Sequence, residues 1–171
     1  MSEIQNVEQI PARSFPLVGG IDRELNVGDK VTGAIRGIRS TRPMQGLVSP
    51  ERKIIVPGPE ILPRCNTCFQ GIFGPNAILR RMRNVDFVNF LEVNEPVTVD
   101  FILKQSRGTR EKGMSAVFEF KCAVERDQKE IVIATGDFHV FRFPESPAQA
   151  IRDRLKYGGK IAEKDRLDRD A

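Results

Sequence analysis

The second half of the chain alternates apolar and polar residues with a period of two. Between residues 115 and 125 the apolar set is Ala116, Phe118, Phe120, Cys122 and Val124. The positions in between include Glu119 and Lys121. This alternation is typical of an antiparallel strand with one buried and one solvated face. We therefore predict a strand here, with the apolar set buried.

Two further stretches continue the pattern on either side. Residues 86–103 alternate with a break at Pro96, and residues 130–143 alternate with a bulge predicted at Gly136. The polar run 126–129 between two of the stretches predicts a hairpin connection. Three long strands in succession predict an antiparallel meander.

The first half of the chain is less regular. Residues 31–39 predict a strand in which Gly33 and Gly37 indicate a bulge or a close backbone approach. Residues 53–56 predict a short apolar strand that ends at the following Pro57–Gly58–Pro59.

A helix is predicted to begin at Gly74–Pro75–Asn76, because proline is well tolerated at the first helical position. Its apolar stripe would be Ile78, Leu79 and Met82, with Arg80, Arg81 and Arg83 outside the stripe and near its C-terminal end. Two glycines and a proline in residues 60–74 predict no uninterrupted helix before this point. A second helix is predicted from Ser146–Pro147 to about Tyr157, before a charged tail.

Composition narrows the class of protein. The 171 residues are 40% hydrophobic and 29% charged, as in ordinary globular proteins. No apolar run reaches the ~18 residues of a membrane span, and the N-terminus lacks a signal-peptide pattern. Three cysteines, an odd number, argue against a disulfide framework and favour a reducing cytoplasm. The net charge of +4 is spread along the chain, so we expect no nucleic-acid partner.

The order of an early strand, an inserted helix and a three-strand meander resembles the hot-dog superfamily over residues 28–143. The resemblance implies an α+β fold in which a curled antiparallel sheet surrounds a central helix. It leaves residues 1–27 as a lead-in and residues 144–171 as a C-terminal helix and charged tail. It also implies acyl thioesters as substrates and a homodimer, because a lone sheet of this kind leaves an edge open.

Two branches of the superfamily bear on the chemistry. The dehydratase branch carries a His and a Phe-Pro-Gly turn before its helix, whereas the only histidine here, His139, lies on the last predicted strand. The stretch CFQGIFGPNAILRRMRNVDF is similar to a segment of the double-hot-dog acyltransferase/decarboxylases of polyketide pathways, with Gly71 and Asn76 in comparable places. That family's tyrosine nucleophile has no counterpart here. This similarity implies acyl-CoA or acyl-carrier-protein partners, and it does not carry over the reaction.

The resemblance places the thioester at the start of the central helix, where backbone N–H groups can stabilise an oxyanion. We predict catalytic roles for Asn66, Cys68 and Asn76, and substrate-binding roles for Thr67, Gln70, Gly71, Arg80 and Arg81. The amides, hydroxyl and thiol can orient water or contact the thioester, and the arginines can contact phosphates. The alternative interpretation is that these residues only cap the helix and line a pocket.

The Cys65-Asn66-Thr67-Cys68 motif has the spacing of a redox pair or of half a zinc site. A structural zinc needs about four ligands, and only Cys122 and His139 remain as soft donors, so we predict a structural or pocket-lining role and no metal or other cofactor.

Four functions stay open at this point. The favoured one is an enzyme that hydrolyses or transfers acyl thioesters in fatty-acid or polyketide metabolism. The second is a non-catalytic module that binds acyl groups or docks a carrier protein, and the third is a dehydratase-like enzyme without the usual histidine beside the helix. The fourth is a β-barrel that binds a small molecule unrelated to thioesters.

Overall fold

The computed structural model describes residues 14–16, 24–38 and 54–144. The predicted helix from Ser146 and the two terminal segments around the predicted 28–143 domain lie largely outside these residues. In chain order the elements are β1 (Ser14–Pro16), β2 (Glu24–Asn26), β3 (Lys30–Ile35), β4 (Ile55–Val56), α1 (Gly58–Phe73), β5 (Ala77–Phe87), β6 (Leu91–Glu92), β7 (Val97–Thr109), β8 (Gly113–Arg126) and β9 (Lys129–Arg142).

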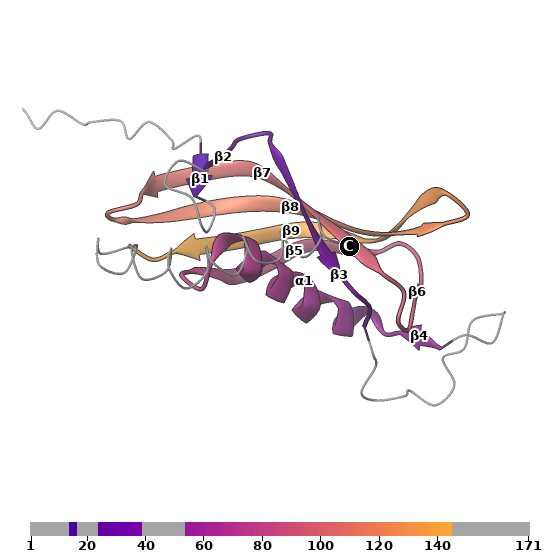
Figure 1. Cartoon of the computed structure of the whole chain (residues 1–171). Coiled ribbons are helices and arrows are strands. Elements are labelled where there is room, and N and C mark those ends of the chain that lie inside the picture. Colours follow the sequence, from indigo (N-terminus) through magenta and orange to yellow (C-terminus); the bar gives the residue numbers. More distant parts are fainter. Residues whose placement is uncertain (1–13, 17–23, 39–53, 145–171) are drawn as a thin grey trace, which may run out of the picture.

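An antiparallel sheet of five strands in the order β3-β7-β8-β9-β5 forms the body of the molecule. Helix α1 lies along one side of this sheet (Figure 1). The consecutive strands β7, β8 and β9 are neighbours, so the predicted meander is confirmed. The break at Pro96 is also confirmed, because β7 begins at the next residue. Strand β3 is shorter than predicted and ends before Gly37.

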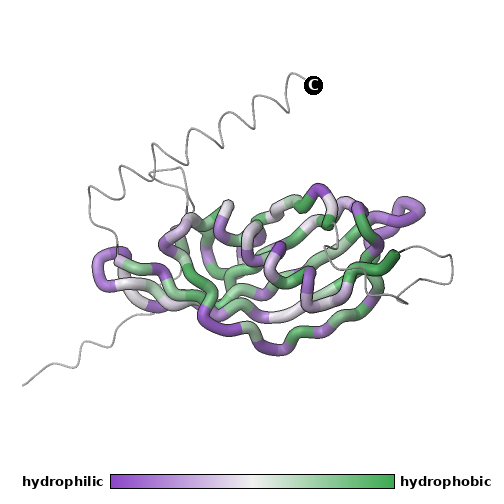
Figure 2. Tube along the Cα trace, turned by 90° about the horizontal axis from the view of Figure 1, so that it is seen from below, coloured by the Kyte–Doolittle hydropathy of each residue, from purple (hydrophilic) through white to green (hydrophobic). Residues whose placement is uncertain are grey.

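The strands place alternate residues on two faces, which we call the helix face and the far face. On the helix face, Phe118 of β8 lies between Leu103 of β7 and Phe138 of β9, and all three are fully buried. The predicted apolar set of β8 is buried throughout, as expected. On the far face the neighbouring row contains Val117 and His139. In Figure 2 the two hairpin turns at the ends of the meander are hydrophilic, whereas the strands mix both kinds of residue.

The central helix begins earlier than predicted and is uninterrupted. Its buried residues Ile61, Cys65, Phe69 and Phe73 recur every fourth position and form a stripe against the sheet. Burial of a large apolar side chain contributes about 1.5–3 kcal/mol, and four of them exceed the ~3 kcal/mol that an internal proline costs. The helix therefore continues through Pro63 and Gly71, and the predicted interruption is wrong.

The predicted helix from Gly74 is wrong, because residues 77–87 form the edge strand β5, paired with β9. The apolar spacing of Ile78, Leu79 and Met82 fits a helical stripe, but pairing with β9 decides the structure. Gly74 ends α1 instead, with φ +89°, and its N–H donates to Gln70 O at 2.8 Å. The C-terminal carbonyls of α1 are complemented by the buried Arg142, whose Nη1 donates to Phe73 O at 2.9 Å, and not by Arg80, Arg81 and Arg83.

Phenylalanine rings fill the space between α1 and the sheet. The Phe69 ring lies 4.4–5.8 Å, centroid to centroid, from the rings of Phe73, Phe101, Phe118 and Phe138. Most of these pairs meet edge to face, which is a favoured geometry for aromatic pairs.

Two glycines stand where a side chain has no room. A Cβ atom on Gly33 of β3 would overlap the Cys68 Sγ atom of α1, so the close contact at this residue is with a side chain. The predicted close backbone approach is found at Gly37, where a Cβ atom would lie 3.0 Å from the Asn94 backbone.

A Cβ atom on Gly136 would lie 2.7 Å from the Phe120 ring. Gly136 pairs with Phe120 in regular register, and the register shift of the β8–β9 pair lies between Cys122 and Ala123. The irregularity predicted at Gly136 occurs on the other side of β9. There the register with β5 shifts between the pairs Arg83–Asp137 and Asp86–Thr135, and the extra residue belongs to β5.

Candidate functional site

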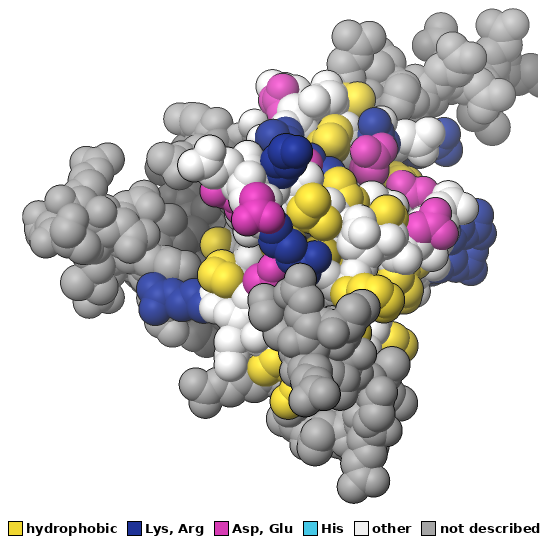
Figure 3. Space-filling model, turned by 90° about the vertical axis from the view of Figure 1, so that its right-hand side faces the viewer, with side chains coloured by type: hydrophobic (Ala, Val, Ile, Leu, Met, Phe, Trp, Pro, Cys, Tyr) yellow, Lys and Arg dark blue, Asp and Glu magenta, His cyan; other side chains and the backbone are white. Residues whose placement is uncertain are grey.

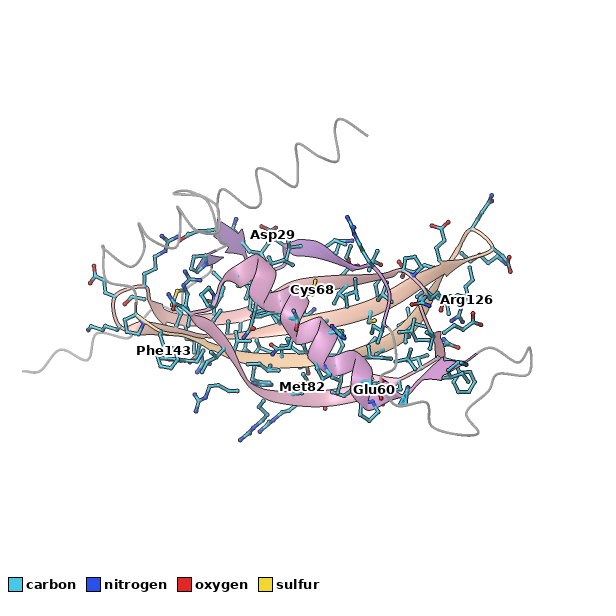
Figure 4. The ribbon with its side chains drawn as sticks, turned by 60° about the horizontal axis from the view of Figure 1, so that its bottom comes forward. Asp29, Glu60, Cys68, Met82, Arg126 and Phe143 are labelled. Carbon is cyan, nitrogen blue, oxygen red and sulfur yellow. The ribbon has the colours of Figure 1, made fainter. Side chains whose placement is uncertain are left out.

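The sequence predicts the site on the central helix, which is α1, and this helix runs along part of the sheet (Figure 1). Figure 4 shows Glu60 at the N-terminal end of α1, on the side of the molecule where Arg126 lies, and Phe143 towards the other end. The helix begins at Gly58, so Asn66 and Cys68 lie in its middle. The prediction that they stand at the start of the helix is therefore wrong, while their catalytic role stays a prediction.

The structure separates the remaining predicted residues. Thr67, Gln70 and Gly71 are exposed on α1, and the Thr67 hydroxyl donates to Pro63 O at 3.0 Å within the helix itself. Asn76 lies in the connection to β5, where its carbonyl accepts a hydrogen bond from Phe143 N at 3.0 Å. Arg80 and Arg81 line a hollow on the far face, on the other side of the sheet from α1. One pocket does not unite all eight residues.

Asn66 lies on the side of α1 that faces β5. Cys68 points towards Gly33 of β3. Residues two positions apart in an α-helix point in directions about 200° apart, so Asn66 points nearly opposite to Cys68. Figure 4 shows Met82 of β5 on this opposite side of the helix. Asn66 Oδ1 is buried and has no hydrogen-bond partner among the described residues. A buried polar atom without a partner costs about 1–3 kcal/mol, and such atoms often mark places where a ligand or water binds.

The three cysteines lie at contacts of the helix and the sheet. The thiol of Cys65 is hydrogen-bonded to Cys122 in the core, and this contact together with burial raises the pKa of Cys65 far above its usual range. A thiol that keeps its proton is a poor nucleophile. Cys68 is half-buried against Gly33, and none of the three cysteines forms a disulfide bond. Within residues 14–16, 24–38 and 54–144, no group of three His, Cys, Asp or Glu residues could hold a metal ion.

The N-terminal end of α1 has an apolar surface that sequence reasoning missed. We call it the apolar end patch, and it consists of Ile54, Phe87, Val88 and Phe90, each 46–62% exposed. The Phe87 ring packs against Gly58, the first residue of the helix. Figure 3, which views the side where β4 and β6 lie, shows hydrophobic side chains at the surface among charged ones. The apolar residues of the run DFVNF, residues 86–90, indicate such a surface, but the alternation of residues 86–103 predicts a strand there instead.

The backbone under this patch is held firmly. Val88 N donates to Ile133 O at 2.8 Å, and Asn89 Nδ2 donates to Val132 O at 2.8 Å. Arg126 forms two hydrogen bonds with the Glu95 carboxylate, at 2.7 and 2.8 Å, and a third with Phe90 O at 2.6 Å. The apolar side chains are thus displayed from a fixed backbone. The N-terminus of α1 beside them carries Glu60 in its first turn, and its N-cap, Pro57, has no side-chain hydrogen bond to the helix.

In the described part of the chain, no helix is both long and apolar enough to cross a membrane. No protein-family model matches the sequence, and no curated protein is similar enough in sequence to assign a family.

Solved structures resemble the fold at low sequence identity. The R-hydratase PhaJ1 from Pseudomonas aeruginosa is 12% identical with a TM-score of 0.55, over 71% of this chain and 84% of that one. An (R)-hydratase from A. caviae involved in PHA biosynthesis is 16% identical with a TM-score of 0.54, over 70% of this chain and 98% of that one. A protein from Archaeoglobus fulgidus is 12% identical with a TM-score of 0.52, over 79% and 86% of the two chains. These likenesses, with the sheet order and the helix on one face, show that the chain has the hot-dog fold.

Proposed function

We propose that the protein processes acyl thioesters of CoA or of an acyl carrier protein, by hydrolysis or acyl transfer, with Asn66 at the reacting centre. Two things support the proposal: the hot-dog fold, which is typical of acyl-thioester enzymes, and hydratases among the similar structures. The observation that carries it is the buried, unpartnered Oδ1 of Asn66 on the central helix.

An asparagine can act on a thioester without changing its own protonation state. Its Nδ2 can donate to the thioester carbonyl, where negative charge develops during attack. Its Oδ1 can accept a hydrogen bond from the attacking water or thiol and so hold it in place. Asn66 is therefore proposed to orient the reactants, and it does not supply the base.

Dehydration by a histidine is disfavoured by the geometry. His139 is the chain's single histidine, and it lies on the far face with Val117, across the sheet from α1. A general base must come within hydrogen-bond reach of its proton, directly or through one water. His139 thus lies on the wrong side of the sheet to act together with Asn66.

A second copy of this chain remains the proposed partner, and the apolar end patch is the surface proposed for it. The strand β5 is the sheet edge next to Asn66, but its two bulges and its arginines are features that oppose edge-to-edge pairing. Apolar side chains on a fixed backbone at the end of β5 are better suited to an interface. We also propose acyl-CoA and acyl carrier protein as partners.

Turnover of acyl thioesters tests the function. Short, medium and aromatic acyl-CoA thioesters are assayed for thiol release, with enoyl-CoA hydration measured in parallel. Wild-type activity should fall about 10²-fold or more in Asn66→Ala. It should be unchanged in Arg64→Ala, which alters an exposed residue of the same helix. Circular dichroism confirms that both variants fold.

Each outcome has a meaning. Thiol release that survives Asn66→Ala would remove Asn66 from the reaction. A wild-type protein that binds acyl-CoA without turnover would favour the non-catalytic acyl-binding module. Hydration that depends on His139 would reinstate the dehydratase-like alternative. Neither binding nor turnover would overturn the proposed function.

A further inference from the structure

The far face of the sheet contains a hollow of about 460 Å³ with a cationic lining. Its charged lining residues are Arg80 and Arg81 of β5, Arg107 of β7 and, when protonated, His139 of β9. Among the described residues, no acidic side chain lines it. We call it the cationic hollow, and we propose that it binds a phosphate group of a small molecule, on the opposite side of the sheet from Asn66.

The strand register brings these residues together. Gln105, Val117, His139 and Arg81 form one row across β7, β8, β9 and β5, because each is the partner of the next. Arg107 lies two residues further along β7, opposite Ser115. The register thus places Arg107 on β7 and Arg81 on β5, on the two sides of β8 and β9. The hydroxyl of Ser115 on β8 lies between these strands, and Gln105 lies on the same strand as Arg107.

A β-bulge doubles the charge on one side of the hollow. Leu79 pairs with Val140 and Arg81 with His139, so Arg80 is an extra residue in β5. Leu79 packs against the core on the helix face, while both Arg80 and Arg81 line the hollow. In an unbroken strand two consecutive residues would point to opposite faces. Bulges often re-aim a side chain in this way next to binding sites.

The charges of the cationic hollow are not neutralised within the described residues. Arg80, Arg81, Arg107 and His139 form no ion pair or side-chain hydrogen bond there. The adjacent charges of the far face are paired instead. Lys104 lies 3.1 Å from Glu119, and Asp137 accepts a hydrogen bond from Asn84 at 2.8 Å. Three unpaired guanidinium groups in one hollow repel one another, and an anion bound between them relieves that repulsion.

A phosphate group suits this arrangement better than an acidic protein surface does. Guanidinium groups present paired N–H donors that match phosphate oxygens, and three of them converge here from separate strands. The volume of the hollow falls within the ~300–1,000 Å³ that small-molecule sites occupy. An acidic protein partner would instead be expected to meet a flat, extended basic stripe.

Calorimetric titration at low ionic strength tests the proposal, with three probes: inorganic pyrophosphate, adenosine 3′,5′-bisphosphate and uncharged adenosine. Both phosphates should bind, and adenosine alone should not. Affinity should fall about tenfold or more in Arg107→Gln and again in Arg81→Gln, since each removes charge-assisted hydrogen bonds. Arg64→Gln changes the net charge equally on the helix side of the molecule and should leave the affinity unchanged.

The two variants come from different strands, so a folding defect in one does not prevent the test. A bisphosphate that binds much more tightly than pyrophosphate would identify a nucleotide ligand, and equal affinities would identify an isolated phosphate group. No binding of either phosphate would overturn the proposal. An equal loss of affinity in Arg64→Gln would overturn it as well. The proposal does not rest on thioester processing, because phosphate binding is measured without turnover and Asn66→Ala should leave it intact.

Discussion

The helix face and the far face of the sheet are built from alternate residues of the same strands, yet one face packs apolar rings and the other carries charges. On the helix face, Phe118 and Phe138 are fully buried and pack against Phe69 of α1. On the far face, charges are paired in one region, and in the cationic hollow they have no partner among the described residues. Neighbouring positions of one strand therefore face a packed core on one side and a charged surface on the other.

The largest expected difference between the faces comes from two phenylalanines of β9. Phe138→Ala removes a fully buried ring that contacts the rings of Phe69, Phe101 and Phe120, so it should cost about 3–5 kcal/mol of unfolding free energy. Phe141→Ala acts on the far face, where the ring is only half-buried and contacts Phe143, and it should cost about 1 kcal/mol or less. Urea unfolding measures both. Equal costs would contradict the division of the two faces.

Replacing glycine by alanine should lower the stability of the protein at one position and raise it at another. Gly33→Ala places a methyl group against Cys68 Sγ between β3 and α1, and it should cost about 1–3 kcal/mol. Gly71→Ala meets no atom within 4 Å on the exposed side of α1, and it should stabilise the helix by about 0.5–1 kcal/mol. Adding Cys68→Ala should restore part of the stability lost in Gly33→Ala, as measured by thermal unfolding. A loss that Cys68→Ala does not reduce would exclude this contact as the cause.

The buried thiol should make stability depend on pH in the alkaline range. Its contact with Cys122 raises the pKa of Cys65 in the folded protein, while an unfolded thiol has a pKa of about 8.5. The stabilisation is therefore complete below about pH 8.5 and is lost as the pH rises above it, by up to ~1.4 kcal/mol per pH unit. Urea unfolding from pH 7.5 to 10 should show a steeper decline for the wild type than for Cys65→Ala. Parallel declines would mean that Cys65 ionises equally in both states.

The smallest effects are expected on the far face. Lys104→Gln breaks a largely exposed ion pair with Glu119 and should lower the unfolding free energy by a few tenths of a kcal/mol. Arg107→Gln removes one of three unpaired guanidinium groups and should leave stability unchanged or raise it by up to about 0.5 kcal/mol. Both effects should vanish at 1 M salt, where charges are screened within about 3 Å. A marked loss of stability in Arg107→Gln would show that its charge has a structural partner.

Much of the fold could be predicted because its signals are local. The strict alternation in β8 predicts both its burial and its place in the meander, since a period of two leaves no other regular structure open. The hot-dog resemblance, which rested on the order of elements, is confirmed. The CxxC motif was given a structural role, and Cys65 does lie in the core beside Cys122.

The site was harder to predict, because the position of the helix was wrong. Ile78, Leu79 and Met82 fit a helical spacing, and only their pairing with β9 shows that they belong to a strand. Pro63 and Gly71 predicted an interruption that the burial of Phe69 and Phe73 overcomes. The polar residues thought to surround the start of a helix are therefore divided between its middle, its exposed side and the far face of the sheet. Their roles stay predictions, and Asn66 is the one that the geometry favours.

By itself the sequence determined the meander and its buried face, because periodicity and residue type act over a few neighbouring residues. Only the tertiary structure decided that residues 77–87 are a strand, that α1 runs unbroken from Gly58, and that four basic residues from three strands meet in one hollow. These outcomes depend on register, on a bulge at Arg80 and on burial between layers. Each of them joins residues far apart in the chain, so no local pattern could encode them.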